Sequence, residues 1–477
     1  MVTLLREPAR PAAIREHPLA PWFAVATVCF GGFMGQLDAS VVTVAFPALQ
    51  RQFGTGLAAT QWVSLGYLLV LTALLVPAGR WSDRAGRKLL YLYGFVLFAG
   101  ASAACGLAPS LGVLIALRVV QAAGAALLQA NSVALVVTSV PARSRRAALG
   151  VQAAAQAVGL ACGPVVGGVL VGTVGWRWVF LINVPVGLLA VVAGWYLLPR
   201  TRRTGDLGPG DRGRGADLGG TVLLAASASA GMLAVSSLSG LGLPAGAVAA
   251  CAAAAVAAGA ALVRHERRAA APLLDLRALA AAGTGPALGG ALCSYLVLFG
   301  PLVLFPQVVS ARGGSAASAG LLLTALPAGF GLAAVAVDRL IPAGWPNRRR
   351  CALGGALAAV GAAALAVPAP DALSAALLGL LGVGLGIYTP ANNAEIMASV
   401  PARDAAAAGG MVNMTRGIGT ALGVAVVSLG LHVGTVLGRP DAGLTLSMAA
   451  LAAVALAAVW CGQRGGRTAR PRPAGPR

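Results

Sequence analysis

The chain of 477 residues is 58% hydrophobic and only 10% charged, and its mean hydropathy is +0.82. Soluble proteins carry about 25% charged residues and disordered ones few apolar residues, so both classes are excluded. The charges are unbalanced, since 35 Lys and Arg against 14 Asp and Glu give a net charge of +21. Such a surplus ordinarily suggests nucleic-acid binding, and the positions of the basic residues decide whether it does here.

Apolar runs of roughly 20 residues, the length of a helix that crosses about 30 Å of hydrocarbon, follow one another along the chain. They predict an all-α integral membrane protein with fourteen transmembrane helices. The predicted spans are approximately 22–46, 58–78, 89–107, 111–136, 147–173, 178–198, 217–238, 244–263, 284–305, 316–337, 351–367, 373–394, 408–431 and 443–461.

The basic residues gather in alternate gaps between these runs. Of the 35, 29 lie in the two tails and the even-numbered gaps, and Arg118 and Arg416 lie inside runs. The remaining four lie in odd-numbered gaps, namely Arg51, Arg177, Arg312 and Arg439. By the positive-inside rule, both termini are cytoplasmic in a multi-pass protein of the cell membrane. No cluster is large enough for a nucleic-acid-binding face, so the partners we expect are the lipid bilayer and small molecules, not nucleic acid.

Cysteine and histidine give no sign of a metal site or a catalytic centre. The seven cysteines occur singly without CxxC spacing, and the three histidines are isolated. Neither a zinc site nor a Ser-His-Asp arrangement can be assembled from them. We therefore predict no metal and no catalytic residues, and an enzyme within the membrane is disfavoured.

A stretch of the chain recurs 260 residues later. Val140-Pro-Ala-Arg143 is followed by Gly150, Gln156, Gly159 and Gly163, and Val400-Pro-Ala-Arg403 is followed by Gly410, Arg416, Gly419 and Gly423. Both copies start in a cytoplasmic loop and run outward, so they are parallel repeats, as in transporters whose halves are related by an axis along the membrane normal. Chance similarity in a chain rich in Ala and Gly is the alternative.

The repeat and the charges together predict the domain organisation. A cytoplasmic tail at 1–21 precedes a six-helix half at 22–198, and a second six-helix half at 284–461 precedes a basic cytoplasmic tail at 462–477. The segment 199–283 then holds cytoplasmic linkers and an inserted transmembrane hairpin at 217–263. Two parallel six-helix halves are the arrangement of the major facilitator fold.

Several sequence blocks resemble those of one branch of this superfamily, the fourteen-span drug:proton antiporters of the multidrug and quaternary-ammonium efflux type. Residues 79–88 (GRWSDRAGRK) resemble the superfamily's G-x-L-x-D-R-x-G-R-K loop. Residues 37–47 resemble the branch's L-D-x-T-I-V-N-V-A-L-P block, with Ser40, Thr43 and Phe46 as departures. Residues 118–124 resemble R-x-x-Q-x-x-G, residues 159–168 resemble G-x-x-x-G-P-x-x-G-G, and residues 176–187 match the beginning of its sixth span.

The resemblance implies a secondary active transporter and not an enzyme. It would be a proton-driven antiporter that exports amphipathic drugs, antibiotics or toxic metabolites by alternating access, with the proton gradient in place of a cofactor. Function as a monomer is expected. The alternatives are a proton-coupled importer or metabolite transporter on the same fold, and a non-transporting membrane sensor or enzyme.

Asp38 is the first candidate for proton coupling. An acid deep in a span costs roughly 2.5–3.5 kcal/mol, so it is tolerated mainly where it faces a cavity or a partner. At about 1.5 Å per residue, Asp38 and Arg118 both lie roughly 12 Å below the outer surface. We expect Asp38 to bind the proton and Arg118 to tune it, which the resemblance also implies; a static ion pair between two spans is the alternative.

Two glycine-containing motifs have expected mechanical roles. In the antiporter motif, Gly159, Gly163 and Gly167 share one helix face that allows close backbone approach, and ordinary helix packing is the alternative. Pro164 can bend the helix, and Gly168 completes the motif. In the gating loop, by resemblance, Asp83 engages the positive N-terminal end of the span that begins near Ala408. The other loop residues are Gly79, Arg84, Gly86, Arg87 and Lys88.

A substrate pocket is expected near the midplane between the halves, lined by polar and aromatic side chains of the spans. Arg416 could meet either Glu395 or an anionic group of the substrate. The candidates are Gln36, Gln61, Tyr67, Gln121, Gln129, Asn131, Gln156, Tyr295, Gln307, Tyr388, Asn392, Asn413 and Arg416.

Overall fold

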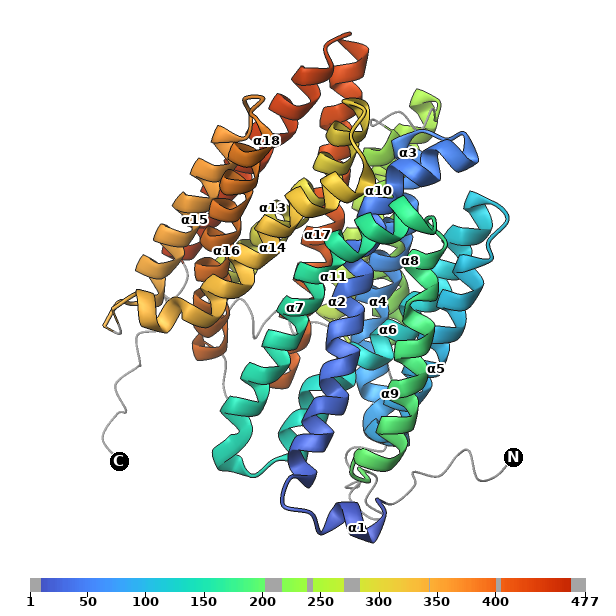
Figure 1. Cartoon of the computed structure of the whole chain (residues 1–477), viewed down its shortest axis with the longest axis vertical. Helices are drawn as coiled ribbons and strands as arrows, with labels where there is room; N and C mark the ends of the chain where they lie inside the picture. Colours follow the sequence, from blue (N-terminus) through green and yellow to red (C-terminus); the bar gives the residue numbers. More distant parts are fainter. Residues whose placement is uncertain are drawn as a thin grey trace.

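The computed structural model describes residues 10–201, 217–237, 243–269, 284–342, 344–399 and 405–464. All regular structure in these ranges is helical, and the long helices run roughly parallel to one another (Figure 1). We call the two ends of this bundle the α1 end and the α3 end, after the short helices α1 (Ala12–Arg15) and α3 (Leu57–Thr60) that lie there.

The N-terminal helix group holds the long helices up to residue 197. They are α2 (Ala20–Phe53), α4 (Trp62–Ala85), α5 (Arg87–Gly106), α6 (Leu111–Ser139), α7 (Arg145–Thr173) and α9 (Asn183–Leu197), the last preceded by the short α8 (Trp178–Leu181). Helix α2 runs well past the predicted end at 46, because the chain stays helical through polar residues until Gly54, whose φ of 62° ends it. Between α4 and α5, Gly86 turns the chain with a φ of 108°, a conformation that favours glycine.

The C-terminal helix group has six long helices. They are α13 (Gly285–Ala311), α14 (Ala316–Leu340), α15 (Asn347–Ala364), α16 (Asp371–Ser399), α17 (Ala405–Val436) and α18 (Pro440–Arg464). Between the two groups in sequence, α10 (Leu218–Ser236) and α11 (Ala245–Glu266) form a helical hairpin. The hairpin packs through α10 against α4 and α17, one helix from each group.

Twelve helices in the described ranges are long and apolar enough to cross a membrane, so the protein is a multi-span membrane protein. Two of the fourteen predicted spans fall short of this measure. The apolar part of α10, Gly219–Ala234, is shorter than the others, and the first turn of α15 holds Arg348, Arg349 and Arg350.

Equivalent helices of the two groups pack through equivalent glycines. Gly94 of α5 lies against Gly124 of α6, and Gly354 of α15 lies against Gly384 of α16, with an offset of 260 residues in both positions. Likewise Gly159 of α7 lies against the backbone of α2, and its repeat partner Gly419 of α17 lies against the backbone of α13. The offset seen in the sequence repeat is thus also present in the packing of other helix pairs.

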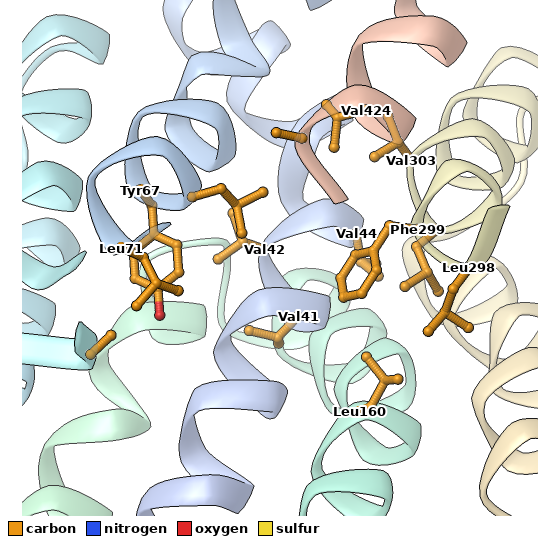
Figure 2. Packing of buried hydrophobic residues seen from close by; sticks show 14 of the residues in the cluster. Val41, Val42, Val44, Tyr67, Leu71, Leu160, Leu298, Phe299, Val303 and Val424 are labelled. Atoms are coloured by element: carbon orange, nitrogen blue, oxygen red, sulfur yellow. The ribbon is translucent and has the colours of Figure 1, made fainter. Parts of the chain in front are cut away.

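The two groups meet closely toward the α3 end. A β-carbon added at Gly168 of α7 would lie only 2.5 Å from the carbonyl oxygen of Ala316 in α14. Arg51 at the end of α2 donates a hydrogen bond to Ser310 Oγ of α13 at 3.5 Å. Figure 2 shows the apolar cluster below these contacts, where Val44 of α2 faces Phe299 of α13. The bundle is therefore closed toward the α3 end.

Candidate functional site

A cavity of about 240 Å³ lies between the two helix groups. It is lined by α2, α4, α6 and α7 on one side and by α13 and α17 on the other. Most of its lining residues come from the middle of each helix or from the part nearer the α1 end, for example Gly31 to Ala39 of α2 and Leu149 to Gln156 of α7, whereas those of α4, from Tyr67 to Leu75, extend toward the α3 end. Because the α3 end is closed, the cavity faces the α1 end.

Seven of the predicted pocket candidates line this cavity. They are Gln36, Tyr67, Gln129, Gln156, Tyr295, Asn413 and Arg416. Gln152 also lines it, so one wall carries four glutamine side chains that can both donate and accept hydrogen bonds. The facing wall carries Arg416, Asn413 and the stacked rings of Tyr295 and Phe299, whose centroids are 6.3 Å apart.

The other predicted pocket candidates bond between helices elsewhere. Gln61 Nε2 donates to Ser236 Oγ of α10 at 3.0 Å, and Asn131 Nδ2 donates to Ser82 Oγ of α4 at 2.7 Å. Tyr388 Oη donates to the carbonyl of Ala458, and Asn392 Nδ2 to that of Ala287, both at 2.8 Å. Two candidates remain, and these are Gln121, which belongs to the charged site described next, and Gln307, which lies outside the cavity toward the α3 end of α13.

Asp38 and Arg118 form a direct ion pair in the core of the N-terminal helix group. Arg118 Nη1 lies 2.6 Å from Asp38 Oδ2, and both side chains are buried, with 1% and 0% of their surfaces exposed. The second carboxylate oxygen, Oδ1, accepts hydrogen bonds from Gln121 Nε2 at 3.1 Å and Asn183 Nδ2 at 2.9 Å. Three donors from three side chains therefore contact the two carboxyl oxygens of Asp38.

The guanidinium of Arg118 is equally well surrounded. Its Nε donates to the carbonyl of Val63 at 3.0 Å, and Nη1 also donates to Gln121 Oε1 at 2.6 Å. The ring of Tyr67 covers it at 4.1 Å from the centroid, a cation–π contact. Tyr67 also lines the cavity, whereas Asp38 and Arg118 do not. The tyrosine ring thus stands between the ion pair and the cavity.

Sequence reasoning missed two members of this network. Asn183, at the start of α9, belongs in the sequence only to the motif that begins the sixth span, and Ser102 of α5 belongs to no motif. Ser102 Oγ accepts hydrogen bonds from Gln121 Nε2 at 2.6 Å and from Asn183 Nδ2 at 3.4 Å. A single Ser in an apolar run carries little signal, because serine is common at helix contacts in membranes.

The glycines of the antiporter motif pack on the helix that carries Asp38. Gly159 lies against the backbone of Phe33, Gly163 against Ser40, and Gly167 against Val41, all in α2. Gly168 lies on a different face of α7 and contacts α14 of the other group. Helix α7 therefore joins the neighbourhood of Asp38 to the contact between the two groups. Because Gly163 has no side chain, it leaves room for the side chain of Ser40, a residue that departs from the family pattern.

In the gating loop, the side chains of Asp83 and Arg84 and those at the start of α17 lie outside the described residues. The expected contact of Asp83 with that helix end therefore stays a prediction. Lys88 is buried, and its Nζ donates to the carbonyls of Trp195 and Leu198 at 2.8 Å each. This lysine satisfies carbonyls at the C-terminal end of α9 that have no partner within that helix.

Comparison with known proteins agrees with this arrangement. Residues 28–424 match the family model described as the Major Facilitator Superfamily. The chain belongs to that superfamily of transporters. It is 31% identical over 429 residues to the methylenomycin A resistance protein of Streptomyces coelicolor. The aligned residues cover 88% of this chain and 86% of the relative.

A second relative is the tetracenomycin C resistance and export protein of Streptomyces glaucescens. It is 30% identical over 443 residues, which cover 88% of this chain and 78% of the relative. Among solved structures, a bacterial homologue of the human lysosomal transporter Spinster matches with a TM-score of 0.65 at 16% identity. The match covers 96% of this chain and 100% of that one, and it supports the superfamily fold.

Proposed function

We propose that this superfamily member is a proton-driven antiporter that exports amphipathic small molecules from the cytoplasm. The observation that carries the proposal is the buried Asp38 and Arg118 pair, which lies next to the cavity but is covered by Tyr67. Two relatives named for resistance or export of antibiotics support the direction of transport.

The proposed topology has fourteen spans, with α10 and α11 as an inserted transmembrane hairpin between two six-helix halves. Contacts at opposite ends of this hairpin support it. Near the α3 end, Ser236 of α10 accepts the hydrogen bond from Gln61. Toward the α1 end, Asp217 Oδ1 lies 2.8 Å from His265 Nε2, where α11 returns. The charge distribution makes the α1 end cytoplasmic, so both termini are cytoplasmic in the plasma membrane and the cavity faces the cytoplasm.

The proton and the substrate would be coupled through Tyr67. When Asp38 is a carboxylate, it binds Arg118, and the tyrosine ring rests on the guanidinium. Protonation removes the negative charge, so Arg118 loses its counter-ion and its position is no longer fixed by an ion pair. Because Tyr67 forms both the cover of Arg118 and part of the cavity wall, a shift of Arg118 changes the cavity. The arrangement with Asp38 ionised and the cavity facing the cytoplasm suits the step in which substrate is loaded.

The glycine-lined contacts of α7 would let the two halves rock. Gly159, Gly163 and Gly167 provide a smooth face toward α2, and Gly168 one toward α14. Smooth faces permit sliding without side chains interlocking. We assign Asp83, Arg84 and Arg87, with the hinge glycines Gly79 and Gly86, to the cytoplasmic gate. The protein is proposed to act as a monomer, without enzymatic activity and with the proton gradient as its energy source.

Substitution of Asp38 by Asn tests the proposal. Asp38→Asn keeps the shape of the side chain but cannot take up a proton, so we expect proton-driven efflux in vesicles to fall at least about a hundredfold, as when a catalytic proton-transfer group is lost. Asp371→Asn, in the exposed first turn of α16, is the matched control and should transport normally. Retained proton-coupled efflux by Asp38→Asn, at normal expression, would exclude the coupling role.

The same assay separates export from the importer alternative. Everted vesicles that are energised should accumulate a substrate of an exporter, whereas an importer would lose it. A drug-sensitivity panel in a pump-deficient host, with Asp38→Asn as the negative control, would identify the compounds to use.

A further inference from the structure

The charge of the cavity is set by one side chain. Among the described residues that line it, Arg416 of α17 is the only one with a formal charge. The other polar lining residues are amides and hydroxyls, and the nearby acid Asp38 is neutralised by Arg118 behind Tyr67. A cavity with one cation and no exposed carboxylate has a positive potential.

Arg416 has few partners. Its Nη1 donates to Asn413 Oδ1 at 3.4 Å, and its guanidinium carbon lies 5.0 Å from the centroid of the Tyr295 ring. Its Nε is buried and has no hydrogen-bond partner in the described part of the chain. The carboxylate of Glu395 does not reach it, since Glu395 instead accepts a long hydrogen bond from Asn347 Nδ2 at 3.5 Å.

Arg118 and Arg416, the two arginines inside predicted spans, therefore differ in how many interaction partners they have. Arg118 has a carboxylate, a backbone carbonyl, an amide oxygen and a ring around it. Arg416 has one weak amide contact and one ring, and no acid lies within ion-pair distance among the described residues. An arginine cannot lose its proton to relieve this deficit, so the free donors are available to a ligand.

We propose that Arg416 is the recognition site for the anionic group of the substrate, so that this transporter prefers amphipathic organic anions such as aromatic carboxylates. The guanidinium presents a planar pair of donors that matches a carboxylate. Beside it, the stacked rings of Tyr295 and Phe299 offer an aromatic surface for an apolar body, and the glutamines of the facing wall can bond its neutral polar groups. This assignment names the substrate class and rests on the proposed transport function.

The internal repeat supplies a conservative substitution for the test. Arg416 corresponds to Gln156, 260 residues earlier, and both side chains line the cavity. Arg416→Gln therefore removes the charge but introduces a residue that the opposite wall of the cavity already accommodates.

Three probes with the same naphthyl body but different charge measure the preference, namely naphthylacetate, naphthylacetamide and naphthylethylammonium. Binding to the full-length protein, purified in an uncharged detergent, is followed by isothermal titration. We expect naphthylacetate to bind about tenfold or more tightly than the amide, and the ammonium most weakly. Arg416→Gln should abolish the preference, and Arg416→Lys should retain part of it because the charge remains.

Arg312→Gln, at an exposed arginine of the loop after α13, controls for the loss of one positive charge and should leave the preference unchanged. Asp38→Asn should also retain the preference. If Asp38→Asn exports normally while the preference holds, the coupling mechanism fails and the anion site stands. Four results would each contradict the proposed anion site. They are equal binding of the three probes, tighter binding of the ammonium, no binding at millimolar concentration, and an unchanged preference in a folded Arg416→Gln. If Arg416→Gln does not fold, the charge series on the unaltered protein and on Arg416→Lys decides.

Discussion

The two helix groups have the same packing but different interiors. Gly94 against Gly124 in the first group corresponds to Gly354 against Gly384 in the second. With this offset, Arg118 corresponds to Leu378 and Gln121 to Leu381, both fully buried. Phe33 of α2 contacts Gly159, and Leu292 of α13 contacts the repeat partner Gly419. Asp38 lies five residues after Phe33, and Val297 lies five residues after Leu292, so Val297 is the counterpart of Asp38. Where the first group has a charged network, the second has an apolar core.

This difference shows which residues the fold itself does not need. The second group forms the same helix contacts with valine and leucines at the equivalent positions, so the ion pair is not required for that packing. A buried ion pair is at best weakly stabilising compared with apolar residues of similar size. Its presence in one group alone favours a functional role over a structural one.

The largest effect is expected when the first group is given the apolar interior of the second. Asp38→Val alone leaves Arg118 buried without its counter-ion, and we expect it to lower the free energy of unfolding by about 3–5 kcal/mol. Asp38→Val combined with Arg118→Leu should recover most of that loss, because no charge remains unpaired. Thermal unfolding of the purified variants in detergent measures both effects.

Transport by the same double variant then distinguishes coupling from a static ion pair. With the coupling role, the double variant is stable but shows no proton-driven efflux. If it exports normally, the pair only joins α2 to α6. If it is as unstable as Asp38→Val, the apolar core of the second group is not a valid guide to the first.

The residues of the charged network differ in how well they could be predicted from the sequence alone. Asp38 and Arg118 could be found because isolated charges in apolar runs are rare, and their similar depth allowed a pair, whereas the sequence could not tell whether their helix faces agree. Ser102 and Asn183 could not, because a polar residue within a span does not indicate which neighbouring helix it faces. The superfamily fold followed from the spans, the repeat and the motifs.

The pocket could be predicted only in part for the same reason. Tyr388 and Asn392 lie on α16 at a suitable depth, but they face α18 and α13 and not the cavity. Position along a span gives depth, whereas rotation about the helix axis depends on packing with neighbours. Lys88 shows a related limit, since its sequence context marks it as a topology charge while the fold buries it.

The repeated glycines Gly163 and Gly423 also differ in what they contact. A β-carbon at Gly163 would meet the Ser40 side chain and lie 3.1 Å from the backbone nitrogen of Val41, and one at Gly423 would lie 2.5 Å from the carbonyl oxygen of Leu296. We expect Gly163→Ala and Gly423→Ala each to cost about 2–3 kcal/mol of stability through overpacking. Only Gly163→Ala displaces the segment next to Asp38, so only it should also slow proton-coupled exchange.

Substrate counterflow and pH-driven uptake, measured on both variants at a temperature where both are folded, test this distinction. Replacing Ser40 by Gly in the Gly163→Ala background removes the side chain that the new methyl group meets, and should restore part of the rate. Equal slowing by Gly423→Ala would mean that both halves must slide to the same extent, and the glycines would then have no special relation to Asp38.

The smallest expected effect is a difference in stability between variants of two basic residues at equivalent positions of the two groups. Lys88 corresponds to Arg348 at the offset of 260. Lys88 Nζ donates to two carbonyls of the α9 end, whereas the side chain of Arg348 is only half-buried and has no hydrogen-bond partner among the described residues. Lys88→Met should therefore lower stability by about 1–2 kcal/mol, and Arg348→Met should change it little.

Thermal unfolding checks the stability difference, and cysteine-accessibility labelling of the loops checks topology in the same variants. Each substitution removes one positive charge from the first turn of a helix near the α1 end, which is the side proposed to be cytoplasmic, so a role in topology alone would make the two variants alike. A stability loss confined to Lys88→Met would show that this lysine of the gating loop anchors the end of α9, so that movement of the loop is tied to the helix that brings Asn183 to Asp38. Equal behaviour of the two variants would leave Lys88 as a topology charge and remove that mechanical link.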